Sequence, residues 1–96
     1  MTTVLISHRV ADYDGWKAVY DEVVAGPLGS DVRSYRIWWR GQDDPNLVII
    51  EETYESRDVA EAAFANPALP DVIAGAGVDM ASMRIDYVDE VASGAH

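Results

Sequence analysis

The chain has 96 residues, which is enough for one domain with a single modest core. Seven basic residues against 17 acidic ones give a formal net charge of −10, which argues against nucleic-acid and anionic-membrane partners, because such binding depends on clustered lysine and arginine. Cysteine is absent, which excludes disulfides, thiolate metal sites and a cysteine nucleophile.

The apolar residues do not form a membrane-spanning segment. No apolar run approaches the roughly 18 residues that a transmembrane helix needs. A strand-like segment begins within two residues of Met1, which leaves no room for a signal peptide. We therefore expect a cytoplasmic protein.

The first half of the chain predicts a strand and an amphipathic helix. Residues Val4 to Val10 are apolar and rich in β-branched side chains, which favours a strand. Asp12 is a good N-cap for the helix that follows, and Gly26-Pro27 ends it. The apolar positions of this helix follow the spacing i, i+3, i+4, i+7 and i+8: Trp16, Val19, Tyr20, Val23 and Val24.

Two strands follow, after a connection from Leu28 to Asp31. They run from Val32 to Arg40 and from Asn46 to Tyr54, and residues 41–45 have the composition of a turn. Asp43 and Asp44 belong to that turn, and we interpret them as turn residues and not as metal ligands.

The remaining segment predicts two helical pieces and a fourth strand. Ser56 can cap a helix, and Asn66 can cap a further short helix that has Pro67 at its first position and runs to about Ala74. Glycines at 75 and 77 end that helix. The fourth strand runs from Met80 to Val88, and residues 92–96 form a small-residue tail that we expect to be disordered, with His96 in it.

This order, β-α-β-β-α-β, predicts an α+β fold of the ferredoxin-like type. It has a four-stranded antiparallel sheet with both helices on one face, and residues 1–91 form a single domain. Helices cover only one face of such a sheet, and a soluble monomer seldom exposes several hundred Å² of contiguous apolar surface. We therefore predict a homodimer in which two sheets pack together.

Alternation along the strands separates the two faces of the sheet. The uniformly apolar sets suit the helix-packed core, whereas the mixed sets, which hold arginines, small hydroxyls and one indole, suit a partly hydrated cavity between two sheets. The apolar sets are Tyr35, Ile37 and Trp39 in the second strand and Ala81, Met83, Ile85 and Tyr87 in the fourth. The mixed sets are Ser34, Arg36, Trp38 and Arg40, and Met80, Ser82, Arg84 and Asp86.

Several segments resemble one superfamily. They are residues 4–24 (VLISHRVADYDGWKAVYDEVV), VRSYRIWW, the turn DDPN before an apolar strand, and the acidic-Thr-Tyr strand end. The chain is similar to dimeric α/β-barrel proteins, which include antibiotic-biosynthesis monooxygenases, muconolactone-isomerase-like proteins and stress-responsive barrel proteins. The resemblance covers nearly the whole chain and implies the fold, but it does not select one activity. Its monooxygenases use cavity Asn, Trp, Tyr and Arg residues without flavin or metal, and Asn46 cannot be placed in the cavity.

Three residues are candidates for catalysis. His8, near the end of the first strand, can act as a general base or as a haem or metal ligand, and the alternative is a hydrogen bond to the backbone or to Asp12. Arg36 and Arg84 can stabilise an enolate, phenolate or carboxylate. A structural Arg–Glu network with Glu51 or Glu52 is the alternative for both arginines.

The candidate substrate-binding residues lie on the same strands: Ser34, Tyr35, Trp38, Glu51 and Ser82. Trp38 can stack on a flat aromatic compound, although Trp38 and Trp39 are equally explained as core or interface aromatics. Strand parity leaves open whether Glu51 or Glu52 faces the cavity, and we favour Glu51. We predict no metal site and no cofactor.

These residues suggest a small cofactor-independent enzyme that acts on a hydrophobic aromatic or polyketide-like molecule. Monooxygenation of a phenol, or cyclisation or isomerisation through an enolate, suits the expected cavity. The main alternative is a non-catalytic protein that binds a small hydrophobic molecule. A haem-handling protein is the third possibility, and it depends on His8 alone.

Overall fold

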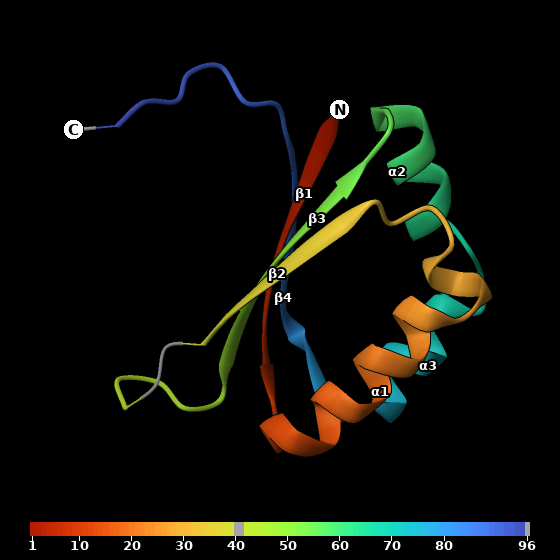
Figure 1. Ribbon diagram of the computed structural model, residues 1–96. Coiled ribbons are helices and arrows are strands. Elements are labelled where there is room, and N and C mark those ends of the chain that lie inside the picture. Colours follow the sequence, from red (N-terminus) through yellow and green to blue (C-terminus); the bar gives the residue numbers. More distant parts are fainter. Residues whose placement is uncertain (40–41, 96) are drawn as a thin grey trace.

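In the computed structural model, which describes residues 1–39 and 42–95, one sheet is covered by helices on a single face (Figure 1). Arg40, Gly41 and His96, about which the sequence analysis makes predictions, lie outside the described residues. The strands are β1 (Thr2–Val10), β2 (Ser34–Trp39), β3 (Leu47–Tyr54) and β4 (Val78–Val88). The helices are α1 (Tyr13–Ala25), α2 (Arg57–Phe64) and α3 (Leu69–Gly75), with a short 3-10 helix at Pro27–Gly29.

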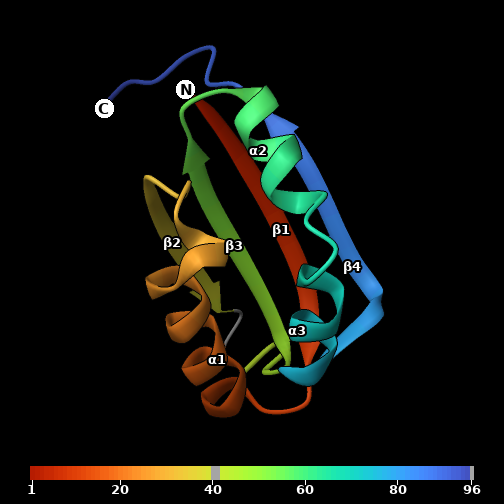
Figure 2. The same ribbon diagram turned by 90° about the vertical axis from the view of Figure 1, so that its right-hand side faces the viewer.

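The sheet is antiparallel throughout, and its strand order is β2-β3-β1-β4. The two central strands, β1 and β3, are therefore the first strands of the two halves of the chain. Figure 2 shows α1 in front of the β2–β3 side of the sheet and α2 and α3 in front of the β1–β4 side. This arrangement confirms the predicted ferredoxin-like α+β fold.

The predicted helix starts are confirmed for α1 and α2. Asp12 accepts a hydrogen bond from the backbone N–H of Gly15 at 2.8 Å, and Ser56 accepts one from the backbone N–H of Val59 at 3.2 Å. Asn66 does not cap α3 as predicted. Its side chain accepts from the N–H of Ala68 at 3.0 Å in a turn that precedes the helix.

The predicted connection after α1 begins with the 3-10 helix Pro27–Gly29. Gly29 allows this helix to lie directly against α1. A Cβ atom at this position would come within 2.5 Å of the Cα atom of Val24. Gly77 has a φ of +83°, so a glycine provides the left-handed turn that leads from α3 into β4.

Burial alternates along the two central strands, as one covered face requires. In β1 and β3 the even-numbered residues are buried against the helices, and the odd-numbered ones are exposed or half-buried. The core residues are Val4, Ile6, Val10, Trp16, Val48, Ile50, Tyr54, Ala60 and Val78. Three polar residues are also buried on this face: Thr2, His8 and Glu52.

Over residues 34–39 of β2 and 84–87 of β4, the register places the predicted face sets where the alternation put them: Ile37 pairs with Ile50, and Ile85 with Ile6, on the helix-covered face. A register shift between Ser7 and Arg9 interrupts the alternation nearer the start of β4, where Val78 is buried opposite Val10. Trp38 pairs with Ile49 on the opposite face, which we call the helix-free face. The pairing of two chains through this face stays a prediction.

After β4 the chain leaves the sheet, and residues 92–95 have no regular secondary structure and are exposed (Figure 1). No helix in the described part of the chain is long and apolar enough to cross a membrane.

Candidate functional site

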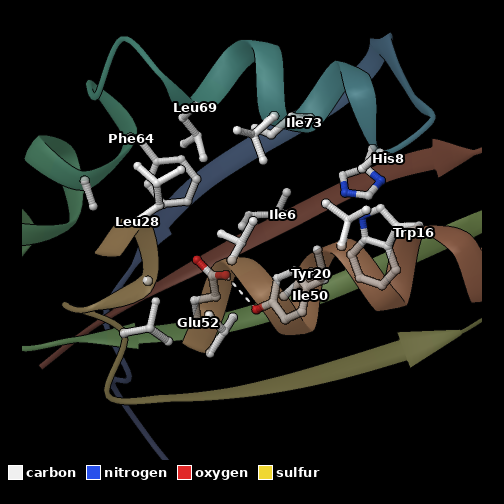
Figure 3. Close-up of a pocket in the computed structure, with 18 of the residues that line it drawn as sticks. Ile6, His8, Trp16, Tyr20, Leu28, Ile50, Glu52, Phe64, Leu69 and Ile73 are labelled. Carbon is white, nitrogen blue, oxygen red and sulfur yellow. Dashed lines mark hydrogen bonds between the residues drawn. The ribbon is translucent and has the colours of Figure 1, made fainter. Parts of the chain in front are cut away.

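The candidate site is an internal cavity between the sheet and its own helices. Its volume is about 90 Å³, and it is lined by residues of β1, β3, β4, all three helices and the α1–β2 connection (Figure 3). Most of the lining is aliphatic, including Ile6, Ile50, Leu69, Ile73 and Met83. A polar group on this wall is therefore held in a medium of low polarity, where its interactions are strong.

Glu52 of β3 is the acidic residue of this wall. Its side chain is 6% exposed, and both carboxylate oxygens accept hydrogen bonds from tyrosines. The hydroxyl of Tyr20, on α1, donates to Oε2 at 2.6 Å, and that of Tyr54, at the end of β3, donates to Oε1 at 2.8 Å. Each carboxylate oxygen therefore has its own hydrogen-bond donor, which fixes the orientation of the group.

Both tyrosines stay protonated in this arrangement. Burial, followed by the charge of Glu52 and the hydrogen bond to it, raises the pKa of Tyr20 and that of Tyr54 far above their ordinary value. Tyr20, Glu52 and Tyr54 therefore form a fixed set, in which two neutral phenols orient one carboxylate.

His8 of β1 is the second polar group of the wall. Its side chain is 3% exposed, and burial lowers its pKa from the ordinary value of 6.5, so the neutral imidazole is favoured at neutral pH. Its Nδ1 atom has no hydrogen-bond partner in the described part of the chain. The predicted alternative, a hydrogen bond to Asp12, is wrong, because that carboxylate caps α1.

Aromatic rings connect the two polar groups along α1. The Trp16 ring meets the His8 ring edge to face at 5.5 Å between centroids and stacks on the Tyr20 ring at 5.1 Å. Figure 3 shows His8 and Trp16 at one end of the cavity and Glu52 towards the other. The wall thus offers a neutral base, an aromatic surface and an oriented anion.

Most of the predicted site residues lie on the other side of the sheet. Arg36 lies opposite Glu51 in the register, and Ser34 lies opposite Thr53, all on the helix-free face. Trp38 lies there too and is 52% exposed. Glu51 lies on the helix-free face, where the predicted cavity between two sheets would form, so the preference for Glu51 stays a prediction. Glu52 lines the different cavity between the sheet and its own helices.

Arg84 and Ser82 of β4 are also outside the internal cavity. Arg84 lies opposite Ser7, and its Nε atom donates to Asp86 at 2.9 Å. The Ser82 hydroxyl accepts from the backbone N–H of Arg9 at 2.8 Å and donates to the carbonyl of Asp79 at 2.6 Å, next to a register shift of the sheet. Both residues have structural partners in the isolated chain.

Tyr35 is the predicted substrate-binding residue that lies on the covered face. Its ring meets the Tyr20 ring edge to face at 5.5 Å, at the edge of the aromatic group, and it is not part of the cavity wall. Trp39 shares this face and contacts Tyr13 at 6.5 Å between ring centroids. Of the predicted set, His8 alone lines the internal cavity.

The sequence analysis named Glu52 only as the alternative to Glu51, and it did not select Tyr20 or Tyr54 as site residues. A signal was present: Glu52 occupies an even position of β3, between the apolar Ile50 and Tyr54, where alternation expects a buried side chain. A buried carboxylate in an apolar row requires hydrogen-bond donors. The two tyrosines could not be identified as those donors without the packing of α1.

No cluster of three or more His, Asp or Glu side chains with the arrangement of a metal site occurs among residues 1–39 and 42–95. The turn residue Asp44 forms an ion pair with Arg9 at 2.6 Å.

The fold has clear relatives among solved structures, although no family model matches the sequence and no curated protein matches it. SnoaB, a cofactor-independent oxygenase from Streptomyces nogalater, aligns over 96% of this chain and 94% of its own, with a TM-score of 0.74 and 12% identity. An antibiotic biosynthesis monooxygenase aligns over 96% and 100%, with a TM-score of 0.64 and 16% identity. At3g17210 from Arabidopsis thaliana aligns over 99% and 100%, with a TM-score of 0.70 and 12% identity.

The chain therefore has the fold of the antibiotic biosynthesis monooxygenases, as the sequence resemblance implied. At sequence identities of 12–16%, these similarities establish the shared fold and not a shared activity. The same fold carries unrelated functions in different proteins, so the activity has to be argued from the cavity.

Proposed function

We propose that this protein is a small cofactor-independent enzyme that acts on a hydrophobic aromatic or polyketide-like compound inside the internal cavity. The observation that carries the proposal is the pairing of a neutral, buried His8 with a tyrosine-oriented Glu52 in one largely apolar cavity. Perturbed titratable groups in a cavity are typical of catalytic sites. The similarity of the fold to a cofactor-independent oxygenase supports the same kind of chemistry.

In the proposed reaction His8 is the general base. Its lowered pKa leaves the imidazole free to accept a proton from a phenolic O–H, or from a C–H group beside a carbonyl. Glu52 orients the substrate by accepting a hydrogen bond from it, while Tyr20 and Tyr54 hold the carboxylate in place. The aromatic surface of Trp16 packs against the substrate ring.

The resulting phenolate or enolate determines the product. In a monooxygenation its carbon adds dioxygen, and the hydroperoxide loses water to leave a carbonyl group. In a cyclisation or isomerisation the same carbanion attacks a carbonyl of the substrate or is reprotonated at another carbon. Both routes begin with the proton transfer to His8, so this step is the one to test.

The size of the cavity limits the substrate. A volume of about 90 Å³ is well below the roughly 300–1,000 Å³ of pockets that hold drug-sized ligands. A compound with a single ring fits this arrangement better than a tricyclic polyketide does.

We also propose that two chains pair through the helix-free face. Trp38 is 52% exposed there and lies opposite the half-buried Ile49 of β3. Leu5 of β1, also half-buried, lies on the same face. Pairing would remove this aromatic and aliphatic surface from water. Arg36, Glu51 and Arg84 would then lie at the interface between the two sheets and not in the reaction cavity.

A non-catalytic binding protein is the second candidate. The observation that favours it is the position of Arg36 and Arg84, the predicted charge-stabilising residues, outside the cavity. A protein that only binds a small ring compound forms no anionic intermediate, so it does not need an arginine in the cavity to stabilise one.

Proton abstraction distinguishes the enzyme from the binder without knowledge of the natural substrate. The probe is phenylacetone, a single-ring ketone, in D₂O, and its exchangeable C–H groups beside the carbonyl are followed by proton NMR. We expect catalysed exchange that falls by about 10²–10⁴-fold in His8→Ala, which is the usual contribution of a general base. Lys17→Ala, which changes an exposed ion pair on α1, is the control and should keep the wild-type rate.

Two results would contradict the proposal. Exchange that is no faster than in buffer, for a folded protein that binds the probe, favours the binding protein. Exchange that depends on Arg84 and not on His8 would place the chemistry on the helix-free face.

A further inference from the structure

The charge of the internal cavity is not balanced by the chain itself. Glu52 is 6% exposed, and within residues 1–39 and 42–95 no lysine or arginine lines the cavity. His8 does not compensate, because burial lowers its pKa and favours the neutral imidazole. A buried carboxylate without a cation is costly, and hydrogen bonds from neutral donors offset only part of that cost.

The tyrosines leave room for a further donor on Glu52. Tyr20 and Tyr54 each donate one hydrogen bond, to different oxygens, and a carboxylate has about four acceptor positions. The remaining positions lie in a wall otherwise made of aliphatic and aromatic groups (Figure 3). A ligand group that reaches Glu52 therefore enters a site of low polarity with a single negative charge.

Aromatic rings line much of the cavity wall. The rings of Trp16, Tyr20, Tyr54 and Phe64 all line it. The Trp16 and Tyr20 rings are stacked at 5.1 Å, and the Tyr54 and Phe64 rings meet edge to face at 6.2 Å. Aromatic faces attract cations, most strongly where water is excluded. Carboxylate and rings together have the chemistry of a site for an organic ammonium group.

We infer that the ligand of the cavity is a small aromatic compound that carries a protonated amine, with its ammonium group on Glu52 and its ring between Trp16 and the aliphatic wall. This inference rests on the proposed function, in that it takes the internal cavity as the ligand site. The amine then determines which C–H or O–H group of the ligand lies near His8. The net charge of −10 also favours the approach of a cation.

The test compares two probes of nearly the same shape and different charge. Benzylamine is protonated at neutral pH, and benzyl alcohol offers a neutral hydroxyl donor on the same ring and methylene. Calorimetric titration of the full chain should show benzylamine binding at least about tenfold more tightly, as expected for a charge-assisted hydrogen bond and a desolvated cation–π contact. This comparison uses the wild-type protein and does not depend on how a variant folds.

Adjacent glutamates provide a matched pair of variants. Glu52→Gln removes the charge in the cavity and keeps the shape of the side chain, whereas Glu51→Gln makes the same change on the helix-free face. We expect Glu52→Gln to lose the preference for benzylamine and Glu51→Gln to keep it. If Glu52→Gln fails to fold, the comparison of the two probes on the wild-type chain still decides the inference.

The failure of this inference differs from the failure of the proposed function. Benzyl alcohol binding as tightly as benzylamine, or a preference that survives Glu52→Gln, overturns the ammonium assignment and leaves the cavity as a site for neutral compounds. If neither probe binds, the cavity is not a ligand site, and both proposals are wrong. A preference that Glu51→Gln removes places the ammonium site on the helix-free face and overturns the inference.

Discussion

The two faces of the sheet are built from the same strands, yet they place charged residues in opposite environments. On the helix-covered face Glu52 and His8 are almost fully buried and line a cavity of low polarity. On the helix-free face Arg84 is exposed and pairs with Asp86 on its own strand. Adjacent residues such as Glu51 and Glu52 thus lie in different environments because one step along a strand reverses the face.

This contrast supports the internal cavity as the site of the proposed reaction. Charges interact strongly where water is excluded and weakly where it is not. The mixed face looked like the more functional one in the sequence because it is richer in arginine, tryptophan and hydroxyl groups. The covered face has fewer polar groups, but helices and tyrosines fix their orientation.

The largest expected difference between the faces is in stability. Glu52→Ala leaves the buried hydroxyls of Tyr20 and Tyr54 without their acceptor and creates a void, so we expect the free energy of unfolding to fall by about 2–4 kcal/mol. Glu51→Ala, on the helix-free face, should change it by less than about 0.5 kcal/mol. Urea denaturation followed by circular dichroism measures both, and equal losses would contradict the assigned difference between the faces.

The second prediction tests the helix-free face as a dimer interface. Trp38→Ala should weaken self-association by about 2 kcal/mol, or roughly 30-fold, because a large aromatic at the centre of an interface is a typical hot spot. Analytical ultracentrifugation over a range of concentrations measures the dissociation constant. Met1→Ala, which changes another exposed apolar side chain, is the control. A wild-type chain that is monomeric at micromolar concentration would rule out the interface.

The third and smallest effect concerns pH and His8. The pKa of His8 is lowered in the folded state, so on acidification below about 6.5 the unfolded chain takes up this proton first. Stability that is present above pH 6.5 is therefore lost as the pH falls towards the folded-state pKa, with a slope of at most about 1.4 kcal/mol per pH unit.

Denaturation of the wild type and of His8→Asn between pH 5 and 7 isolates this contribution, since the carboxylates are common to both proteins. The difference in unfolding free energy between the two should shrink as the pH falls. A difference that is independent of pH would show that His8 has the same pKa in the folded and unfolded chains.

The sequence by itself determined the elements and the faces. The spacing of Trp16 and Tyr20, the cap at Asp12 and the stop at Gly26 are local features, and the order of elements then leaves few arrangements for a chain of this length. Alternation likewise assigned Arg36 and Trp38 to one face and Ile37 to the other, because the period of a strand is two regardless of context.

The tertiary structure alone decided which face encloses a cavity and which carboxylate lies in it. The contacts that define the site join Glu52 of β3 to Tyr20, 32 positions earlier on α1, and His8 to Trp16 across the β1–α1 turn. The alternation of apolar and polar residues along a strand predicts which side chains are covered, but it does not predict which residues cover them. Whether a covered position becomes close-packed core or cavity wall depends on how α1, α2 and α3 sit on the sheet, and that is set by the packing of all their side chains at once.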